Sequence, residues 1–344
     1  MKIVHLFANN KVGGAEIYAI NLATAALNDG HEASFIVSEE GALTKRLTEN
    51  GISFVLIRMD SSFNPFRMSK SVFELKNYFQ KQGIAIVHTH MLREHSLAIG
   101  AKFLGTNIKV VRTFHRLDQF NWKMKPLMWF YNWQTDAFIA ITEYLQKYLV
   151  VNGTVENKIS VILNGVSEIA VNKHDKAIGF LGRLASEKGT LKLLKNNSIE
   201  LVNNSNLVIA GTGPDELAIK KYISEKGFNT KMMGEVSDLN NFFENISVLV
   251  LPSDSEVLPL SILEAFSAGV PVVSFDLPSL VGVLTENNSI TVASGKYEEL
   301  LQAACELLSS TDLDLLSRQV KAEYSEKYTL KLMWQKTFEL YKSL

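Results

Sequence analysis

Short apolar runs alternate with longer amphipathic segments along the whole chain. The short runs have the length and apolar content of buried strands, and segments such as 16–28 and 68–81 have the periodicity of helices. This alternation is typical of repeated strand–helix units and predicts an α/β fold with parallel sheets. In the first half, strands are predicted at residues 3–7, 33–37, 54–57, 85–88, 109–113, 137–141 and 159–163.

The same alternation starts again in the second half, and a chain of 344 residues exceeds the usual size of one core. We therefore expect two Rossmann-like, doubly wound domains that face a central cleft, with ligands at the carboxyl ends of the strands. The expected domains are residues 1–166 and 167–320, and a C-terminal helical segment, 321–344, packs back on the first. Strands of the second half are predicted at 177–181, 206–210, 230–233, 248–251 and 270–275.

Composition and charge narrow the class of protein. Apolar residues make up 47% and charged residues 21%, which suits two globular cores, and a net charge of −1 argues against nucleic acid as a partner. The first apolar run ends by Ala8, too soon for a signal peptide or a membrane span, so we expect a cytoplasmic protein. Cys305 is the only cysteine, which excludes an internal disulfide, and its apolar neighbours predict a small buried core residue.

The strongest local signal is residues 252–273, PSDSEVLPLSILEAFSAGVPVV, which follow a predicted strand. Pro259 suits the first turn of a helix because its missing N–H would have no partner there, and Gly269 before Pro271 ends that helix. The free N–H groups and the positive end of the helix dipole then lie at the carboxyl edge of the sheet. Such a place suits a phosphate.

Glu256 lies in this loop and Glu264 about two turns further along, so the two carboxylates can accept hydrogen bonds from hydroxyls at different ends of one ligand. Helix capping by Glu256 and a surface position for Glu264 are the alternatives. Upstream, a strand is predicted to end at Gly182, and Arg183 and Lys188 follow in a loop. Two cations can neutralise a diphosphate, at roughly 4 kcal/mol per contact at 4 Å and an effective dielectric constant of 20. A solvated basic turn is the alternative.

Two glycine-containing loops and two histidine clusters also follow predicted strands. Gly13 and Gly14 precede a helix, but they do not form the G-x-G-x-x-G fingerprint of dinucleotide binding, and a tight turn explains them equally well. Gly211 and Gly213 have the same ambiguity. The histidines are expected to face the cleft, although a structural role is the commoner one for a single histidine. They are His88, His90 and His115.

Together these motifs resemble the retaining GT-B glycosyltransferases of family 4, over nearly the whole chain and in the family's order. The resemblance implies an acceptor-side first domain and a second domain that binds a nucleotide diphosphate sugar, UDP- or GDP-linked. It assigns Glu256 to the transferred sugar and Glu264 to the ribose, while His90 lies beside the sugar and His115 on the acceptor side. The implied donor-binding set is Gly13, Gly14, Gly182, Arg183, Lys188, Gly211, Gly213, Glu256, Leu258, Pro259, Leu260 and Glu264.

The resemblance also implies transfer with retention of configuration, without a cofactor or metal, in which His90, Arg183, Lys188 and Glu256 form the catalytic set. The implied acceptor is a glycan or a lipid-linked saccharide, in the synthesis of lipopolysaccharide, capsule or another cell-surface polysaccharide. The chain departs from the family where Val257 stands in place of a glycine, because a β-branched residue resists positive φ. This departure puts the identity of the donor in doubt.

Several alternatives stay open. An epimerase or phosphorylase of the same architecture, or a non-catalytic protein that binds glycans or nucleotides, fits the same motifs, whereas an oxidoreductase lacks its fingerprint. Residues 312–314, Asp-Leu-Asp, resemble a metal-binding D-x-D motif, but helix capping explains them better. Residues 120–133 hold three tryptophans and two lysines, which suits either packing on the first domain, the interpretation favoured here, or a peripheral contact with the inner face of a membrane.

Overall fold

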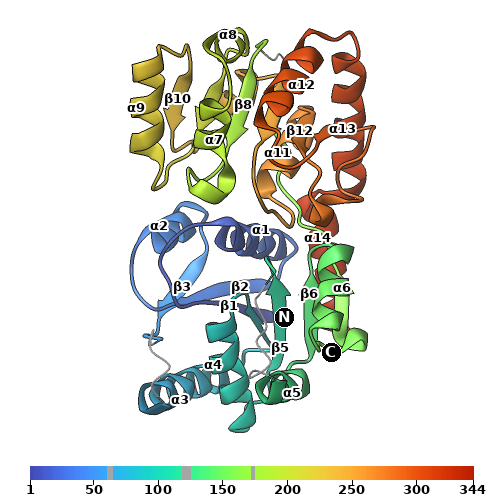
Figure 1. The fold of residues 1–344 in the computed structure, drawn as a ribbon. Coiled ribbons are helices and arrows are strands. Elements are labelled where there is room, and N and C mark those ends of the chain that lie inside the picture. The colour runs from blue at the N-terminus through green and yellow to red at the C-terminus, as the bar shows by residue number, and fades with distance from the viewer. Residues whose placement is uncertain (60–64, 118–124, 172–174) are drawn as a thin grey trace. The chain divides into compact units, whose positions relative to one another are not determined.

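The chain forms two compact units, seen in a computed structural model that describes residues 1–59, 65–117, 125–171 and 175–344 (Figure 1). Unit 1 comprises Met1–Gly165 and Leu330–Leu344, and unit 2 comprises Val166–Thr329. The expected second boundary, after residue 320, falls inside helix α13 (Leu313–Lys327), which belongs to unit 2. The C-terminal helix of unit 1 is α14 (Leu330–Lys342).

Unit 1 contains a seven-stranded sheet in the order β3-β2-β1-β4-β5-β6-β7, and its neighbouring strands pair in parallel. Strand order reverses between β1 and β4, where ligands bind in open sheets of this type. The strands are β1 Lys2–Phe7, β2 Glu32–Val37, β3 Ser53–Leu56, β4 Ile86–Thr89, β5 Lys109–Phe114, β6 Ala137–Ala140 and β7 Ile159–Val161. Besides α14 the helices are α1 Gly14–Asn28, α2 Ala42–Glu49, α3 Pro65–Gln82, α4 Leu92–Phe103, α5 Lys125–Gln134, α6 Glu143–Val151 and the 3-10 turn η2 Glu156–Lys158.

Unit 2 contains a six-stranded parallel sheet in the order β10-β9-β8-β11-β12-β13, with the reversal between β8 and β11. The sequence did not predict β13, a partly exposed edge strand. The strands are β8 Ile178–Leu181, β9 Val208–Ala210, β10 Lys231–Gly234, β11 Val248–Leu251, β12 Val272–Phe275 and β13 Ser289–Val292. Besides α13 the helices are α7 Thr190–Lys195, α8 Ile199–Asn204, α9 Glu216–Lys226, α10 Leu239–Glu244, α11 Leu260–Ala268 and α12 Tyr297–Ser309, with 3-10 turns η3 Ser186–Lys188 and η4 Pro278–Leu280.

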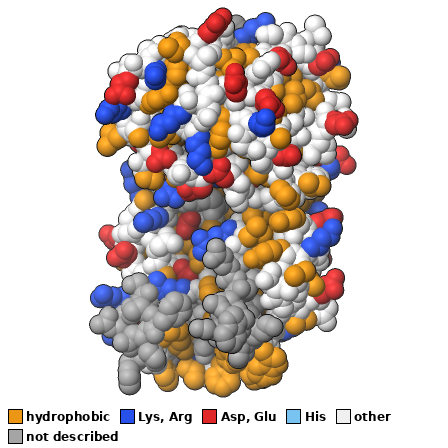
Figure 2. All heavy atoms as spheres, viewed as in Figure 1, with side chains coloured by type: hydrophobic (Ala, Val, Ile, Leu, Met, Phe, Trp, Pro, Cys, Tyr) orange, Lys and Arg blue, Asp and Glu red, His pale blue; other side chains and the backbone are white. Residues whose placement is uncertain are grey.

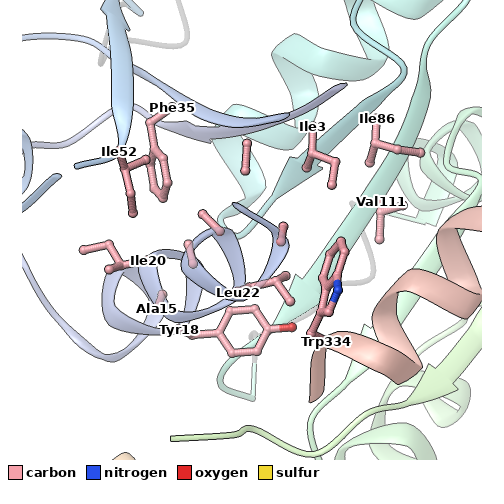
Figure 3. Packing of buried hydrophobic residues seen from close by; sticks show 14 of the residues in the cluster. Ile3, Ala15, Tyr18, Ile20, Leu22, Phe35, Ile52, Ile86, Val111 and Trp334 are labelled. Atoms are coloured by element: carbon pink, nitrogen blue, oxygen red, sulfur yellow. The ribbon is translucent and has the colours of Figure 1, made fainter. Parts of the chain in front are cut away.

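The C-terminal helix α14 is part of the core of unit 1. Figure 3 shows Trp334 of α14 beside Tyr18 and Leu22 of α1, in the cluster that also holds Ile3 and other strand residues. The Trp334 indole N–H donates a hydrogen bond of 2.8 Å to Asp29 Oδ2 at the end of α1. A segment more than 160 residues away from the rest of unit 1 in sequence therefore completes its hydrophobic core.

One local expectation was wrong, and a second is confirmed only in the position of the residue. Cys305 is only half-buried, because its neighbours Leu301 and Ala304 take the inward positions on α12; burial still raises the pKa of its thiol. Asp312 stands at the N-cap of α13, but its carboxylate makes no capping hydrogen bond, and the Ser310 hydroxyl accepts from the Asp312 N–H instead.

Within the described ranges, no helix combines the length and the apolar character that crossing a membrane requires. Of the aromatic segment at residues 120–133, residues 120–124 lie outside the described part of the chain, as do residues 172–174 of the polar segment after the first domain.

Candidate functional site

The loop between β11 and α11 carries Glu256 at the carboxyl edge of the unit 2 sheet. The β11 residues are fully buried, so the chain leaves the core only after Leu251, and Glu256 follows in the loop with 9% of its surface exposed. Pro259 is the N-cap of α11, one residue before the expected first turn, and Gly269 ends the helix with φ +78°. The loop therefore places a largely buried carboxylate just before a helix N-terminus.

Lys188 and Glu256 form an ion pair, with 2.5 Å between Nζ and Oε1. Lys188 ends the turn η3 that follows β8, and β8 lies next to β11, so the two strand ends at the reversal of strand order supply opposite charges. Ser279 of η4 also fixes the loop, because its hydroxyl donates a hydrogen bond to the Glu256 carbonyl. Two of the four expected catalytic residues thus meet in one place, with the ammonium partly open to solvent at 26% exposure of its side chain.

Arg183 forms a different ion pair. Its side chain is 66% exposed, and its guanidinium faces Glu187 at 3.5 Å, one turn along the chain. Glu264, on α11, has intermediate exposure, and so have Pro259 and Leu260. Leu258 is buried. The roles that the resemblance implies for these residues stay predictions.

The glycines at the ends of β8 and β9 bring two loops into backbone contact. A Cβ on Gly211, whose φ is +126°, would lie 1.9 Å from the Gly182 carbonyl oxygen, and a Cβ on Gly213 would lie 2.2 Å from the Leu184 oxygen. The Leu184 N–H in turn donates to the Thr212 oxygen at 2.9 Å. Contact between the loops therefore explains Gly211 and Gly213 without a ligand.

Three further residues of this edge were missed in the sequence. Gly189 caps α7 with φ +74°, and a Cβ there would lie 1.9 Å from the Pro252 oxygen. Ser253 is fully buried, and its hydroxyl makes no hydrogen bond among the described residues. Asp254 accepts from Lys192 at 2.6 Å and from the Tyr297 hydroxyl at 3.0 Å. The glycine that follows Lys188 and the Ser-Asp pair that follows Pro252 are the sequence features that could have pointed to these three residues.

In unit 1, Gly13 and Gly14 open α1 at the carboxyl end of β1. Gly13 is the N-cap, and its N–H donates to Glu16 Oε2 at 3.0 Å. Gly14 is exposed, and a Cβ built on it would meet no atom within 4 Å. Packing within the protein therefore does not require a glycine at position 14, which leaves close approach of a ligand as a reason for it.

Two buried carboxylates hold the same loop. Glu94, on the first turn of α4, accepts from the Ala8 N–H at 2.7 Å, and Glu16 holds Gly13. Burial raises the pKa of Glu16, and the neighbouring Glu94 charge adds to this, although hydrogen bonds from Asn9 and Gly13 oppose the rise. The loop is thus fixed at both ends before any ligand binds.

Three histidines of unit 1, one within β1 and two just after β4 and β5, form a hydrogen-bonded chain. His5 Nδ1 lies 3.1 Å from His90 Nε2, and His90 Nδ1 lies 3.0 Å from His115 Nε2. Burial lowers the pKa of His5 to about 3 and that of His115 to about 3, the latter also because of the Arg112 charge. The pKa of His90 is likewise well below its ordinary value, chiefly through burial. These three histidines are therefore neutral at physiological pH.

His5, His88 and His90 bring ligand atoms within 4.8 Å of one another, but their geometry does not suit a metal ion. The rings are stacked, with interplanar angles of 19° to 28°, so their nitrogens do not converge on one point. His88 also uses both nitrogens, Nδ1 with the Tyr341 hydroxyl at 2.5 Å and Nε2 with Thr113 Oγ1 at 2.7 Å. The donor set fits a hydrogen-bond network better than a coordination sphere.

Comparisons with known proteins extend over both units. The family model "Glycosyltransferase Family 4" matches residues 12–168, and the model "Glycosyl transferases group 1" matches residues 166–326. Among curated relatives, an uncharacterized glycosyltransferase from Haemophilus influenzae is 26% identical over 95% of this chain and 96% of its own length. The UDP-Gal:alpha-D-GlcNAc-diphosphoundecaprenol alpha-1,3-galactosyltransferase from Escherichia coli is 26% identical over 99% and 96%.

Solved structures show the same fold. HepE from Anabaena, in a crystal structure with UDP and glucose, superimposes with a TM-score of 0.85 at 17% identity, and the match covers 100% of both chains. The lipopolysaccharide outer core galactosyltransferase WaaB gives 0.75 at 19% identity, again over both whole chains. With two parallel sheets in the GT-B arrangement and family models that follow one another from residue 12 to residue 326, this chain belongs to the family 4, group 1 glycosyltransferases.

Proposed function

We propose that this glycosyltransferase moves a sugar from a UDP- or GDP-linked donor to a glycan or lipid-linked saccharide, with retention of configuration and without a divalent metal. The product would enter a lipopolysaccharide, a capsule or another cell-surface polysaccharide. The observation that supports this most is the Lys188–Glu256 pair at the reversal of strand order in unit 2. The names of the Escherichia coli relative and of a Staphylococcus aureus capsule glycosyltransferase support the class of acceptor.

The pair suits donor binding because each member has a natural partner on a nucleotide sugar. The Lys188 ammonium can turn from Glu256 to the diphosphate, and Glu256 can then accept hydrogen bonds from sugar hydroxyls. In the transfer, the bond from the anomeric carbon to the diphosphate oxygen breaks and a bond to the acceptor oxygen forms. The acceptor proton passes to a phosphate oxygen of the departing diphosphate. The ammonium stabilises that leaving group.

The acceptor would bind in unit 1, where His115 provides the outer end of the histidine chain. His90 uses both ring nitrogens on other histidines, so we assign it to the support of His115 and to the wall beside the sugar. Gly14 leaves room at the N-terminus of α1 for the reacting groups. No side chain is required as a nucleophile in this scheme, because positioning and charge stabilisation supply the catalysis.

A donor screen tests the proposal directly. Thermal unfolding would be followed with UDP, GDP and their sugars, and a ligand at about 100 times its Kd should add about 2.7 kcal/mol of stability. We expect Lys188→Ala and Glu256→Gln to reduce transfer by roughly 100-fold or more. Lys220→Ala is the matched control, since Lys220 forms an exposed ion pair with Glu216 on α9.

Product analysis separates this function from its rivals. We expect the anomeric configuration of the donor sugar to be kept in the product by NMR, and full activity in EDTA. Conversion of the donor without acceptor would instead indicate an epimerase. Near-normal transfer by both Lys188→Ala and Glu256→Gln would overturn the assignment of the pair.

A further inference from the structure

The tryptophans of α5 are largely exposed. Trp129 is 69% exposed and Trp133 is 58% exposed, and Figure 2 shows hydrophobic side chains gathered at the lower end of the view, where Figure 1 places α5. The favoured expectation that residues 120–133 pack on unit 1 is therefore wrong for these two side chains. Nothing among the described residues shows what covers them.

In unit 2, the peptide bond between Glu256 and Val257 is held from one side by Ser279. The Ser279 hydroxyl donates a hydrogen bond to the Glu256 carbonyl, and Ser279 is only 6% exposed. Ser279 is itself fixed by its place in η4, where the Leu280 N–H donates a hydrogen bond of 2.9 Å to the Leu277 carbonyl. The Glu256 carbonyl therefore points to a buried hydroxyl on a hydrogen-bonded turn.

The N–H of the same peptide has no such partner. Because a trans peptide is planar, the Val257 N–H points in the direction opposite to the Glu256 carbonyl, away from Ser279. Val257 is 7% exposed, yet its N–H makes no hydrogen bond among the described residues. Backbone N–H groups without a partner are rare in buried residues, and this one belongs to the residue that follows Glu256. It is suited to an oxygen atom of a ligand that Glu256 also contacts.

The valine side chain opposes a reversal of this peptide. Rotation of the peptide plane by about 180° would carry the φ angle of Val257 from negative to positive values, which a β-branched residue resists. Among the non-glycine residues that the structure describes, only Asn206 has a positive φ, so Val257 keeps the favoured conformation. The Ser279 hydroxyl and the branched side chain of Val257 therefore favour the same orientation of the peptide by two separate means.

We propose that Ser279 and Val257 are positioning residues that hold this peptide so that its N–H, and not its carbonyl, faces the sugar of the donor. The inference rests on the proposed function, in which Glu256 accepts hydrogen bonds from the same sugar. A carbonyl in this place would add a second acceptor beside a carboxylate. The N–H adds a donor instead, and the two groups together match a sugar hydroxyl, which both donates and accepts.

A comparison of nucleotide sugars with nucleotide diphosphates tests the proposal on the full chain. Dissociation constants would be measured by calorimetry for UDP-galactose, UDP-glucose and GDP-mannose, each against its own nucleotide diphosphate. We expect Ser279→Ala to weaken binding of the nucleotide sugar about tenfold and that of the diphosphate less than about twofold, because the peptide is less often in the orientation that binds the sugar. A lower folded fraction would change both constants alike, so their ratio does not depend on the stability of the variant.

Ser205→Ala is the matched control for the loss of a buried hydroxyl. The Ser205 hydroxyl is also buried and donates to a backbone carbonyl, that of Val202, at the end of α8. Its own carbonyl accepts from the N–H of Ile178, the first residue of β8, so Ser205 lies at the opposite edge of the sheet from Glu256. The ratio of the two constants should stay that of the wild type.

Val257→Gly, alone and combined with Ser279→Ala, tests whether the two residues hold one peptide. Alone it should change the ratio by less than about threefold, since the hydroxyl still holds the carbonyl, and the double variant should lose more than the product of the two single effects. An unchanged ratio in Ser279→Ala, an equal change in Ser205→Ala, or a double variant that equals the product would overturn this inference and leave the proposed function standing. A wild type that binds none of the three nucleotide sugars would overturn both.

Discussion

His5, His90 and His115 share two hydrogen bonds, and each bond needs one nitrogen with a proton and one without. The tautomer of one ring therefore fixes the tautomer of the next. Among the described residues, the two hydrogen bonds of this chain do not use His115 Nδ1. A group bound there that only donates or only accepts a hydrogen bond would set the tautomers of all three rings.

The buried His5 predicts a pH dependence of stability. Its pKa falls from 6.5 to about 3 on folding, so below about pH 6.5 the unfolded chain binds a proton that the folded chain does not. The free energy of unfolding should therefore fall as the pH drops from about 6.5 towards 3, by about 1.4 kcal/mol per pH unit for this residue. Urea unfolding of His5→Gln between pH 7 and 5 should show a correspondingly shallower fall.

The control for this measurement is His31→Gln, because His31 lies outside the histidine chain and contacts Asp29 near the surface. It should keep the steeper pH dependence of the wild type. If His5→Gln also kept it, the proton uptake would have to be assigned to another group.

Sequence reasoning located Lys188, Glu256 and His90 at strand ends but could not show what each side chain contacts. In a doubly wound sheet the carboxyl ends of the parallel strands lie at the same edge. The edge at which these three residues lie could therefore be predicted. The Lys188–Glu256 pair spans 68 residues, and the pairing of His90 with two other histidines depends on side-chain rotamers. Neither contact produces a periodic pattern in the sequence from which it could be predicted.

At the scale of elements, the N-terminus of α7 packs against the end of β11 through Gly189. A Cβ there would overlap the Pro252 carbonyl oxygen, in a backbone conformation that already disfavours other residues. The contact fixes η3, and with it Lys188, relative to the loop that carries Glu256.

We expect Gly189→Ala to destabilise the protein by several kcal/mol, since the clash adds to the backbone cost. Gly227→Ala is the matched control, because Gly227 has a similar φ of +68° but nothing within 4 Å of its Cβ. It should cost only about 1 to 2 kcal/mol. Equal losses of unfolding free energy in urea would show that backbone conformation alone accounts for both.

In the first turn of α1, by contrast, we expect a Gly→Ala substitution not to destabilise the protein. Gly14 has room for a methyl group and lies within a helix, where alanine is favoured over glycine by up to about 1 kcal/mol. Gly14→Ala should therefore keep or slightly raise the melting temperature while transfer falls, if a ligand approaches this backbone. Full activity in steady-state assays would remove Gly14 from the donor-binding set.

Most elements could be predicted from the hydrophobic pattern, which located every strand of unit 1 to within two residues because these strands consist mainly of apolar residues. Strand β13 was missed because its sequence, Ser-Ile-Thr-Val, alternates polar and apolar residues instead of forming an apolar run. The end of unit 2 was misplaced because α13 and α14 are adjacent helices, and amphipathic periodicity does not show which unit each helix covers.

At the scale of the whole molecule, unit 1 is built from two separate parts of the chain. Truncation after Thr329 would remove the buried Met333, Trp334 and Tyr341 and leave His88 without one of its hydroxyl partners. We expect a loss of about 5 kcal/mol or more, at roughly 1.5 to 3 kcal/mol per large buried side chain.

Hydrogen exchange should show this loss in residues 1–165 while residues 166–329 stay protected. Lys342→Ala, at the exposed end of α14, is the control and should leave both units protected. Equal loss of protection in both units would show that they unfold as one.

The pairing of Val166 with Thr329 has a further consequence. Val166 donates to the Tyr328 carbonyl at 2.9 Å and accepts from the Tyr324 hydroxyl at 3.1 Å, so the two ends of unit 2 lie side by side. A polypeptide whose ends meet can be inserted into a host loop, or replaced by a homologous cassette, without stretching either junction. If unit 1 binds the acceptor and unit 2 the donor, as proposed, exchange of residues 166–329 between enzymes of this family should give hybrids that combine one acceptor with a new donor.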